Sequence, residues 1–326
     1  MTPPIIEVDQ LVFDYPGHRA LHGVSFAIER GSVTALVGPN GAGKTTLMRL
    51  IAALDTPFAG TVRVQGVDVQ EAPRAVHRHI GYLADQFGLY GSLSVRRCLA
   101  FAAASQGLAS DEIDAAVQDT ARLLDLEDKL DAQAGRLSRG QRQRVAIGQA
   151  IIHRPAVVLL DEPASGLDPE ARNALAGVFR QMQAAGMTLL VSSHILAELD
   201  AYSTHMLALR EGRIQDLRAL HGASDSLVRR LRLHWRGAAE DALAALRAQP
   251  GVHVLHSETR QAEFELDGDD DAQAQLLERL VQAQRAAASG RFAVIGLEAV
   301  RENLQDSYLR SMQGSAAPAA SDGGRA

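Results

Sequence analysis

The chain has 326 residues, of which 46% are hydrophobic and 22% are charged, and its formal net charge is −6. This composition is typical of a soluble globular protein, and the length is enough for one large domain and a small one. The acidic balance excludes the global basic signature of a nucleic-acid-binding protein, and the single cysteine excludes an internal disulfide.

No uninterrupted apolar run approaches the length of a membrane span, and residues 1–10 contain two prolines and two acids but no basic segment. We therefore expect an intracellular chain that has no signal peptide and does not itself cross a bilayer. Cys98 lies inside an apolar run, so we expect it to be a small buried hydrophobic residue.

The N-terminal part of the chain alternates short β-like segments with turns. Apolar and β-branched residues predict strands at 5–8, 24–28, 33–37 and 61–64, and Gly60 and Gly66 mark turns around the last of these.

The middle of the chain is predicted to be helical from about 95 to 130, since Asp111 and Glu112 precede apolar residues at a 3.6-residue period. Continuous apolar strands follow at 156–160 and 188–192. Such strands, alternating with helices, are typical of a parallel sheet covered on both faces, which places this part in the α/β class.

The composition changes after Gly212, and a linker at roughly 215–226 leads to a second unit. The second unit is predicted to follow a β-α-β-β-α-β order, which suggests a small α+β ferredoxin-like module closed by a further helix at 302–312. Its strands are expected at 227–235, 252–256, 262–266 and 292–297, and its first two helices at 240–249 and 272–287. Residues 313–326 are mostly Ala, Gly, Ser and Pro, and are expected to be disordered.

One stretch near the N-terminus has the phosphate-cradle pattern G-x-x-x-x-G-K-[ST] between a predicted strand and a predicted helix at 47–54. It reads Gly38-Pro39-Asn40-Gly41-Ala42-Gly43-Lys44-Thr45-Thr46. The glycines let the backbone aim several N–H groups at phosphate oxygens, and the helix N-terminus adds partial positive charge. Lys44 would reach the β- and γ-phosphates, and the Thr45 hydroxyl would bind magnesium. The stretch therefore predicts nucleotide binding.

A second pair of candidate residues follows the apolar strand at 156–160, which ends in Asp161-Glu162-Pro163. Because side chains alternate along a strand, the two acids are expected to act differently. Asp161 would hold magnesium, mostly through water, and Glu162 would polarise the water that attacks the γ-phosphate. An N-cap acid beside a surface acid is the alternative interpretation.

A second anion-binding corner is predicted at Leu137-Ser138-Arg139-Gly140-Gln141, which precedes a helix expected at 142–153. Because the first corner already has its own loop, this one suggests a phosphate offered from elsewhere. Ordinary capping of the helix by Ser138 is the alternative.

The order of these motifs resembles that of the nucleotide-binding subunit of an ABC transporter over about residues 5–215. The signature segment reads LSRGQ, the Walker B strand ends at Asp161, and Ser165-Gly166-Leu167-Asp168 matches the D-loop. His194 matches the switch histidine, and Tyr15 matches the aromatic residue that stacks on adenine.

The resemblance implies a P-loop NTPase cassette with a RecA-like core, an antiparallel β subdomain and a helical subdomain at about 85–135. It implies ATP and Mg²⁺ as cofactors and a head-to-tail dimer in which Ser138 and Gly140 serve the partner's ATP. His194 would orient the attacking water. The implied partners are a second ATP-binding subunit, which we expect to be an identical copy although an asymmetric one could supply the second signature, and a separate permease. The chain would then lie on the inner face of the cell membrane through that permease.

Two positions depart from the family's pattern. Arg139 replaces the second signature glycine, and its side chain could point to solvent or toward the ligand. Asp85 stands where the Q-loop glutamine is expected, and Gln86 follows it. Asp85 could bind magnesium as a charged oxygen ligand, and either residue could be an ordinary loop residue.

The segment 87–95 and the C-terminal module are similar to the exporter-type branch, in which the ATPase is a separate chain. The implied domains are 1–215 for the ATPase, 216–226 for the linker, 227–312 for the accessory module and 313–326 for the tail.

There are two competing hypotheses: a soluble ABC-type ATPase switch acting on ribosomes or DNA, and a catalytically silent scaffold. The basic run 229–232 is the only nucleic-acid hint, and a solvated strand face is the simpler interpretation. The cargo is not encoded in this chain.

Overall fold

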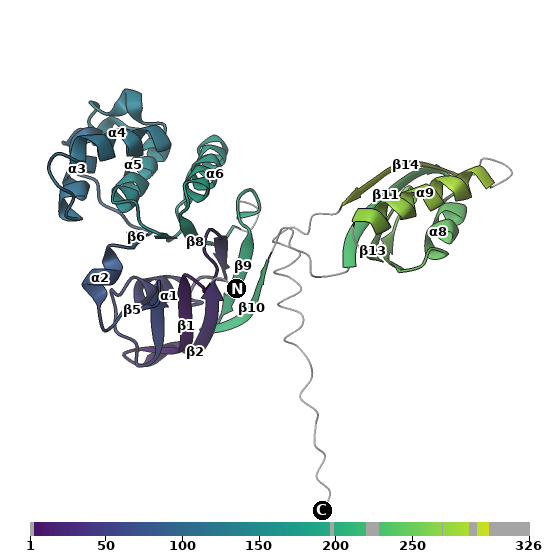
Figure 1. Cartoon of the computed structure of the whole chain (residues 1–326), viewed down its shortest axis with the longest axis horizontal. Helices are drawn as coiled ribbons and strands as arrows, with labels where there is room; N and C mark the ends of the chain where they lie inside the picture. The colour runs from purple at the N-terminus through teal and green to yellow at the C-terminus, as the bar shows by residue number, and fades with distance from the viewer. Residues whose placement is uncertain (1–2, 196–198, 220–227, 269, 287–291, 300–326) are drawn as a thin grey trace, which may run out of the picture. The chain divides into compact units, whose positions relative to one another are not determined.

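The computed structural model describes residues 3–195, 199–219, 228–268, 270–286 and 292–299 (Figure 1). The chain divides into two compact units, so that the described residues up to 219 belong to the first and those from 228 to the second. Expectations for 302–312, 313–326 and most of the linker concern residues outside this described part.

The N-terminal unit contains two sheets and several helices. Its strands are β1 (Ile6–Tyr15), β2 (His18–Ile28), β3 (Val33–Val37), β4 (Ala59–Val64), β5 (Val67–Asp68), β6 (Ile80–Leu83), β7 (Val157–Leu160), β8 (Thr188–Ser193), β9 (His205–Arg210) and β10 (Arg213–Ala219). Its helices are α1 (Lys44–Ile51), α2 (Pro73–His77), α3 (Val95–Ser105), α4 (Ile113–Leu123), α5 (Arg139–Ile151) and α6 (Pro169–Ala184).

The central sheet has the strand order β10-β9-β3-β8-β7-β6. Neighbouring strands from β9 to β6 pair in parallel, and only the edge strand β10 is antiparallel to its neighbour β9. The predicted parallel sheet is therefore confirmed. Residues 216–219, expected to begin the linker, instead complete β10, because an edge strand tolerates the polar residues that suggested a linker.

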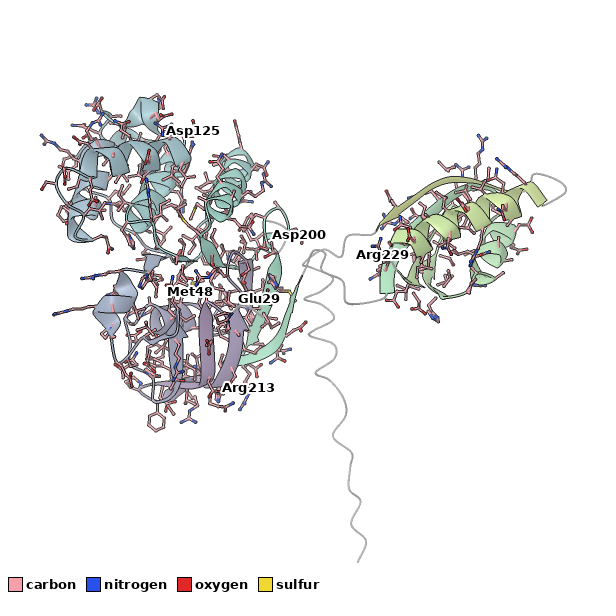
Figure 2. All side chains as sticks on the ribbon, viewed as in Figure 1. Glu29, Met48, Asp125, Asp200, Arg213 and Arg229 are labelled. Atoms are coloured by element: carbon pink, nitrogen blue, oxygen red, sulfur yellow. The ribbon has the colours of Figure 1, made fainter. Side chains whose placement is uncertain are left out.

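Both faces of the central sheet are covered, as the continuous apolar strands predicted. Leu36, Leu159 and Leu190 belong to a core shared with α1 and the antiparallel sheet. The core on the opposite face is shared with α5 and α6, and its strand residues include Val37, Leu160 and Val191. Met48 belongs to the first of these cores and lies on α1 (Figure 2).

The antiparallel sheet has the order β2-β1-β4-β5. The register of β1 shifts against both neighbours, and Gln10 within it has a φ of 47°. This bulge carries β1 on to Tyr15, well past the strand expected at 5–8. The helices α3, α4 and α5 follow β6 and precede β7 in the chain and pack against one another, and Cys98 is buried among them, as expected (Figure 1).

The second unit follows the order β11 (Val228–Gly237), α8 (Ala239–Arg247), β12 (Val252–Ser257), β13 (Gln261–Asp267), α9 (Asp270–Ala286) and β14 (Phe292–Ala299). Its four strands form an antiparallel sheet in the order β12-β13-β11-β14. Each predicted strand and helix of this unit within the described residues is present, with its ends moved by at most a few positions.

The basic run 229–232 is not a freely solvated face. Arg230 and Arg232 both form ion pairs with Glu263 on the adjacent strand β13, and Arg229, labelled in Figure 2, donates to Gln273 on α9. Cross-strand pairing with Glu263 therefore compensates part of the positive charge of the run.

A glycine of β6 offers a test of this packing. A methyl group at Gly81 would overlap the backbone carbonyl oxygen of Ala150, whereas one at Gly177 on α6 would meet nothing within 4 Å. We expect Gly81→Ala to lower the free energy of unfolding by about 1–3 kcal/mol. The control Gly177→Ala should raise it by about 0.5–1 kcal/mol, because it relieves the entropic cost of a helical glycine. Urea denaturation measures both, and equal stability of the two variants would contradict the packing.

Candidate active site

The phosphate loop connects the end of β3 to the start of α1. Gly41 and Gly43 have φ angles of 80° and 103°, a left-handed backbone that other residues adopt only under strain. Gly43 is also the N-cap of α1, and no side chain caps the helix there. The first amides of α1 are thereby left for an anion, which is the arrangement that the motif predicted.

Lys44, the first residue of α1, is buried against the loop. Its ammonium group donates to the carbonyl oxygens of Gly38 at 2.8 Å and Pro39 at 3.4 Å, and it lies 3.5 Å from Oε1 of Glu162. These contacts hold the cation at the mouth of the loop. An anionic ligand there would compete for the same three donor hydrogens.

Asp161 directly follows β7 and is fully buried. Its Oδ1 accepts a hydrogen bond of 2.6 Å from the Ser192 hydroxyl, while Oδ2 is buried without a hydrogen-bond partner. The pKa of neighbouring Tyr82 is raised to about 12, first by burial and then by the negative charge of Asp161. A buried carboxylate with one unpartnered oxygen is suited to a cation or an ordered water.

Glu162 lies beyond the end of β7 on a left-handed backbone, so strand alternation does not set the direction of its side chain. Its φ is 48°, and its N–H donates to the Ser192 hydroxyl at 2.9 Å. Its Oε2 lies 2.7 Å from Nδ1 of His194, which follows β8. The carboxylate is thus held between Lys44 on one oxygen and His194 on the other.

Lys44, Glu162 and His194 line one cavity of about 530 Å³, whereas the buried Asp161 is outside its lining. Parallel strands deliver their carboxyl ends to one edge of a sheet, so segments after β3, β6, β7 and β8 form part of the walls, and β1 and β2 of the antiparallel sheet complete them. The lining residues are Tyr15, His18, Ala20, Asn40, Gly41, Ala42, Gly43, Lys44, Thr45, Thr46, Asp85, Glu162, Ser165 and His194. Gly38 and Pro39 are outside this lining and contribute their carbonyl oxygens to Lys44.

Tyr15 stands at the rim of the cavity and is 43% exposed. Its ring packs edge-on against Phe13, with centroids 5.0 Å apart, and its hydroxyl lies 3.3 Å from the hydroxyl of Thr46. The ring therefore has an exposed apolar surface beside the phosphate loop. Asp85 also lines the cavity, whereas Gln86 is exposed and outside the lining.

The signature residues lie elsewhere in the unit. Ser138 is the N-cap of α5 and forms a reciprocal capping box with Gln141. The helix therefore begins three residues earlier than the sequence suggested, at Arg139. Ser138, Gly140 and Gln141 line a separate cavity of about 250 Å³ together with Asp168, the N-cap of α6.

Comparison with known proteins agrees with this geometry. A model of the family described as ABC transporter matches residues 21–165. The ABC transporter ATP-binding protein NatA of Bacillus subtilis is 35% identical over 210 residues, which are 64% of this chain and 84% of NatA. The chain belongs to the ABC transporter family. It is an ATP-binding protein of that family and an ATPase.

Two further similarities locate the shared part of this ABC ATPase. The spermidine/putrescine import ATP-binding protein PotA of Pseudomonas aeruginosa is 35% identical over 67% of this chain, which spans 60% of the length of PotA. A solved structure of the ATP binding subunit of an ABC transporter has a TM-score of 0.60 and 32% identity, covering 66% of this chain and 90% of the solved one. The cassette fold expected for the N-terminal part is confirmed.

Sequence reasoning about the ABC ATPase site missed Ser192. This residue is fully buried, and its hydroxyl joins the side chain of Asp161 to the backbone of Glu162. Its position at the end of an apolar strand, two residues before His194, was the available signal. Nothing in the sequence alone showed that the neighbouring strand would bring Asp161 against it.

This network generates a prediction. Ser192→Ala removes the hydroxyl that donates to the buried Asp161 carboxylate, so we expect the free energy of unfolding to fall by about 1–3 kcal/mol. Ser193→Ala is the matched control, because the Ser193 hydroxyl accepts a hydrogen bond from the Ile195 amide and bonds to neither acid. Urea denaturation of both variants at neutral pH decides the matter. A smaller effect for Ser192 than for Ser193 would contradict the arrangement.

Proposed function

We propose that this ABC ATPase binds ATP in the cavity beside the phosphate loop and hydrolyses it to power a membrane partner. The observation that carries the proposal is the convergence of Lys44, Glu162 and His194 on one cavity at the carboxyl edge of the parallel sheet. A cation for phosphate, a carboxylate base and an orienting imidazole are the groups that phosphoryl transfer to water requires.

The loop and its surroundings supply binding groups for each part of the nucleotide. The backbone of residues 38–46 and the N-terminus of α1 would hold the phosphates, with Lys44 at the terminal ones. The exposed ring of Tyr15 would stack on the base.

The same residues fit a magnesium ion. Asp161 offers a buried oxygen that lacks a hydrogen-bond partner, and Thr45 is exposed to the cavity. No cluster of three or more His, Cys, Asp and Glu side chains occurs in the described ranges. This agrees with a cation that depends on substrate phosphates for most of its ligands, as Mg²⁺ commonly does. Asp85 would be an additional oxygen ligand, and bound magnesium would neutralise phosphate charge.

Glu162 would accept a proton from the attacking water, and His194 would hold the Glu162 carboxylate and the water in line. The 2.7 Å contact between Nδ1 of His194 and Oε2 of Glu162 supports this division of roles, because it leaves Oε1 for the water once Lys44 turns to phosphate.

The separation of the signature from the phosphate loop supports a dimer. The cavity beside Ser138 and Gly140 shares no lining residue with the cavity beside Lys44. We propose that two copies associate head to tail, so that each ATP lies between the phosphate loop of one and the signature and Asp168 region of the other. Gln141 would support Ser138 through their capping box.

The transport partner is proposed from the family. None of the described helices combines the length and hydropathy that a bilayer crossing requires. A separate permease would therefore supply the membrane path and contact the helical part at about 85–135.

The direction of transport is a separate question, because the PotA relative is named as an importer. Export is favoured by the segment 87–95 and by the added C-terminal module, whose strand order fits a ferredoxin-like arrangement. We propose export. We also propose the domain limits given by the sequence, except that the ATPase unit continues through β10 to Ala219.

The role of Glu162 is testable by an isosteric change. Glu162→Gln removes the base but keeps the shape, so steady-state ATP hydrolysis should fall by about 10²–10⁴-fold. In the presence of ATP the variant should then accumulate as a dimer, which size-exclusion chromatography detects. Glu71→Gln, which changes an exposed acid outside the cavity, is the control and should hydrolyse ATP normally. Unchanged hydrolysis by Glu162→Gln would refute the assignment of the base.

The partner is testable by co-purification. A tagged chain extracted from its host membranes in mild detergent should bring down a polytopic membrane protein in stoichiometric amount, identified by mass spectrometry. The Lys44→Ala variant controls for contacts that depend on nucleotide. Recovery from the soluble fraction with ribosomal or DNA-associated proteins would instead support the soluble switch.

A further inference from the structure

Arg139 occupies the position where the signature would have its second glycine. It is the first residue of α5, directly after the N-cap Ser138. The two directions left open by the sequence were solvent and ligand. The structure shows a third, because the side chain turns back onto its own chain.

The guanidinium of Arg139 contacts the turn that follows Glu162 at Ser165 and Gly166, and we call these two contacts the clasp. Its Nη2 donates to the backbone carbonyl oxygen of Ser165 at 3.1 Å. Its planar group also packs against Gly166, where any added Cβ would overlap it. Gly166 has a φ of 66°, so glycine satisfies both the backbone and the close approach.

The turn that Arg139 contacts is also hydrogen-bonded to Glu162, the candidate base. The N–H of Ser165 donates to the carbonyl oxygen of Glu162 at 3.1 Å, and Ser165 lines the cavity that contains Lys44. A short path of contacts therefore runs from Arg139 through Ser165 to the backbone of Glu162. This path joins the start of the signature helix to the catalytic turn of the same subunit.

A second cavity, of about 430 Å³, lies along this path. Asp85, Glu162 and Ser165 line both it and the nucleotide cavity, and Arg139 and Arg142 line only the second. The two positions that depart from the family pattern, Asp85 and Arg139, thus line one cavity.

We propose that Arg139 is a positioning residue that couples the two ATP sites of the dimer. The inference rests on the proposed head-to-tail arrangement, in which the signature of each subunit serves the ATP of the other. A change that bound nucleotide causes in the turn after Glu162 is then transmitted through Arg139 to Ser138 and Gly140. Each subunit thereby adjusts the signature that it presents to its partner according to the state of its own site.

The contact itself can be tested in the free chain. Arg139→Gly restores the family's residue and removes the clasp, so backbone amides at 165–167 should exchange with deuterium faster. Arg142→Ala is the matched control, since Arg142 lines the same cavity one helical turn away and carries the same charge. Unchanged exchange in Arg139→Gly would show that the clasp does not order the turn.

The coupling is tested by ATP titration of the full-length chain in a Glu162→Gln background, with dimer formation followed by analytical ultracentrifugation. The parent should show a Hill coefficient above 1. Arg139→Gly should bring it to about 1 and raise the half-maximal ATP concentration about fivefold or more, which is the low end of typical coupling between sites. Arg139→Ala, which suits the start of a helix better than glycine, should do the same, and Arg142→Ala should match the parent.

The outcomes separate the two proposals. A parent that dimerises with ATP, together with Arg139 variants of unchanged Hill coefficient, would overturn the coupling role and leave the proposed function intact. A parent that dimerises without cooperativity would also overturn the coupling role. A parent that neither binds ATP nor dimerises would overturn the proposed function and the inference with it.

Discussion

The buried carboxylate of Asp161 is the group on which the arrangement of the site depends. A charge removed from water is costly unless hydrogen bonds or a cation compensate it. The Ser192 hydroxyl satisfies one oxygen and leaves the other open, and the same hydroxyl also fixes the amide of Glu162. One side chain on β8 thus sets the positions of both acids, while the bond between Glu162 and His194 continues the network to the end of that strand.

The second organising feature is that one chain contains two corners proposed to bind anions, which face different cavities. The corner at α1 is built from glycines that have no side-chain cap, whereas the corner at α5 is closed by a capping box. An uncapped helix end is ready for an external anion, and a capped one keeps its turn ordered until a ligand arrives. In the proposed dimer the two corners belong to one ATP only when two chains meet. Within a chain, Arg139 joins the start of α5 to the turn after Glu162.

The C-terminal unit shows how far local pattern can carry a prediction. Alternating burial along β11 and β13 places residues such as Leu231 and Phe264 in the core and leaves the charged residues between them on the other face. That alternation was visible in the sequence, so the order of strands and helices was correct. The pairing of Arg230 and Arg232 with Glu263 was not visible, because it depends on the register between two strands that are separated by α8 and β12.

The sequence by itself determined many of the elements and the chemistry that is local in the chain, but it did not indicate β6, β9, β10 or α6. The phosphate loop, the apolar strand before Asp161 and the capped start of α5 are each set by residues within a few positions of one another. Only the tertiary structure decided which distant groups meet. Ser192 binds Asp161, His194 binds Glu162, and Arg139 reaches Ser165 instead of solvent or ligand. The physical reason is that periodicity and turn chemistry act over one or two turns of chain, whereas contacts across parallel strands follow from sheet order and from the packing of both its faces.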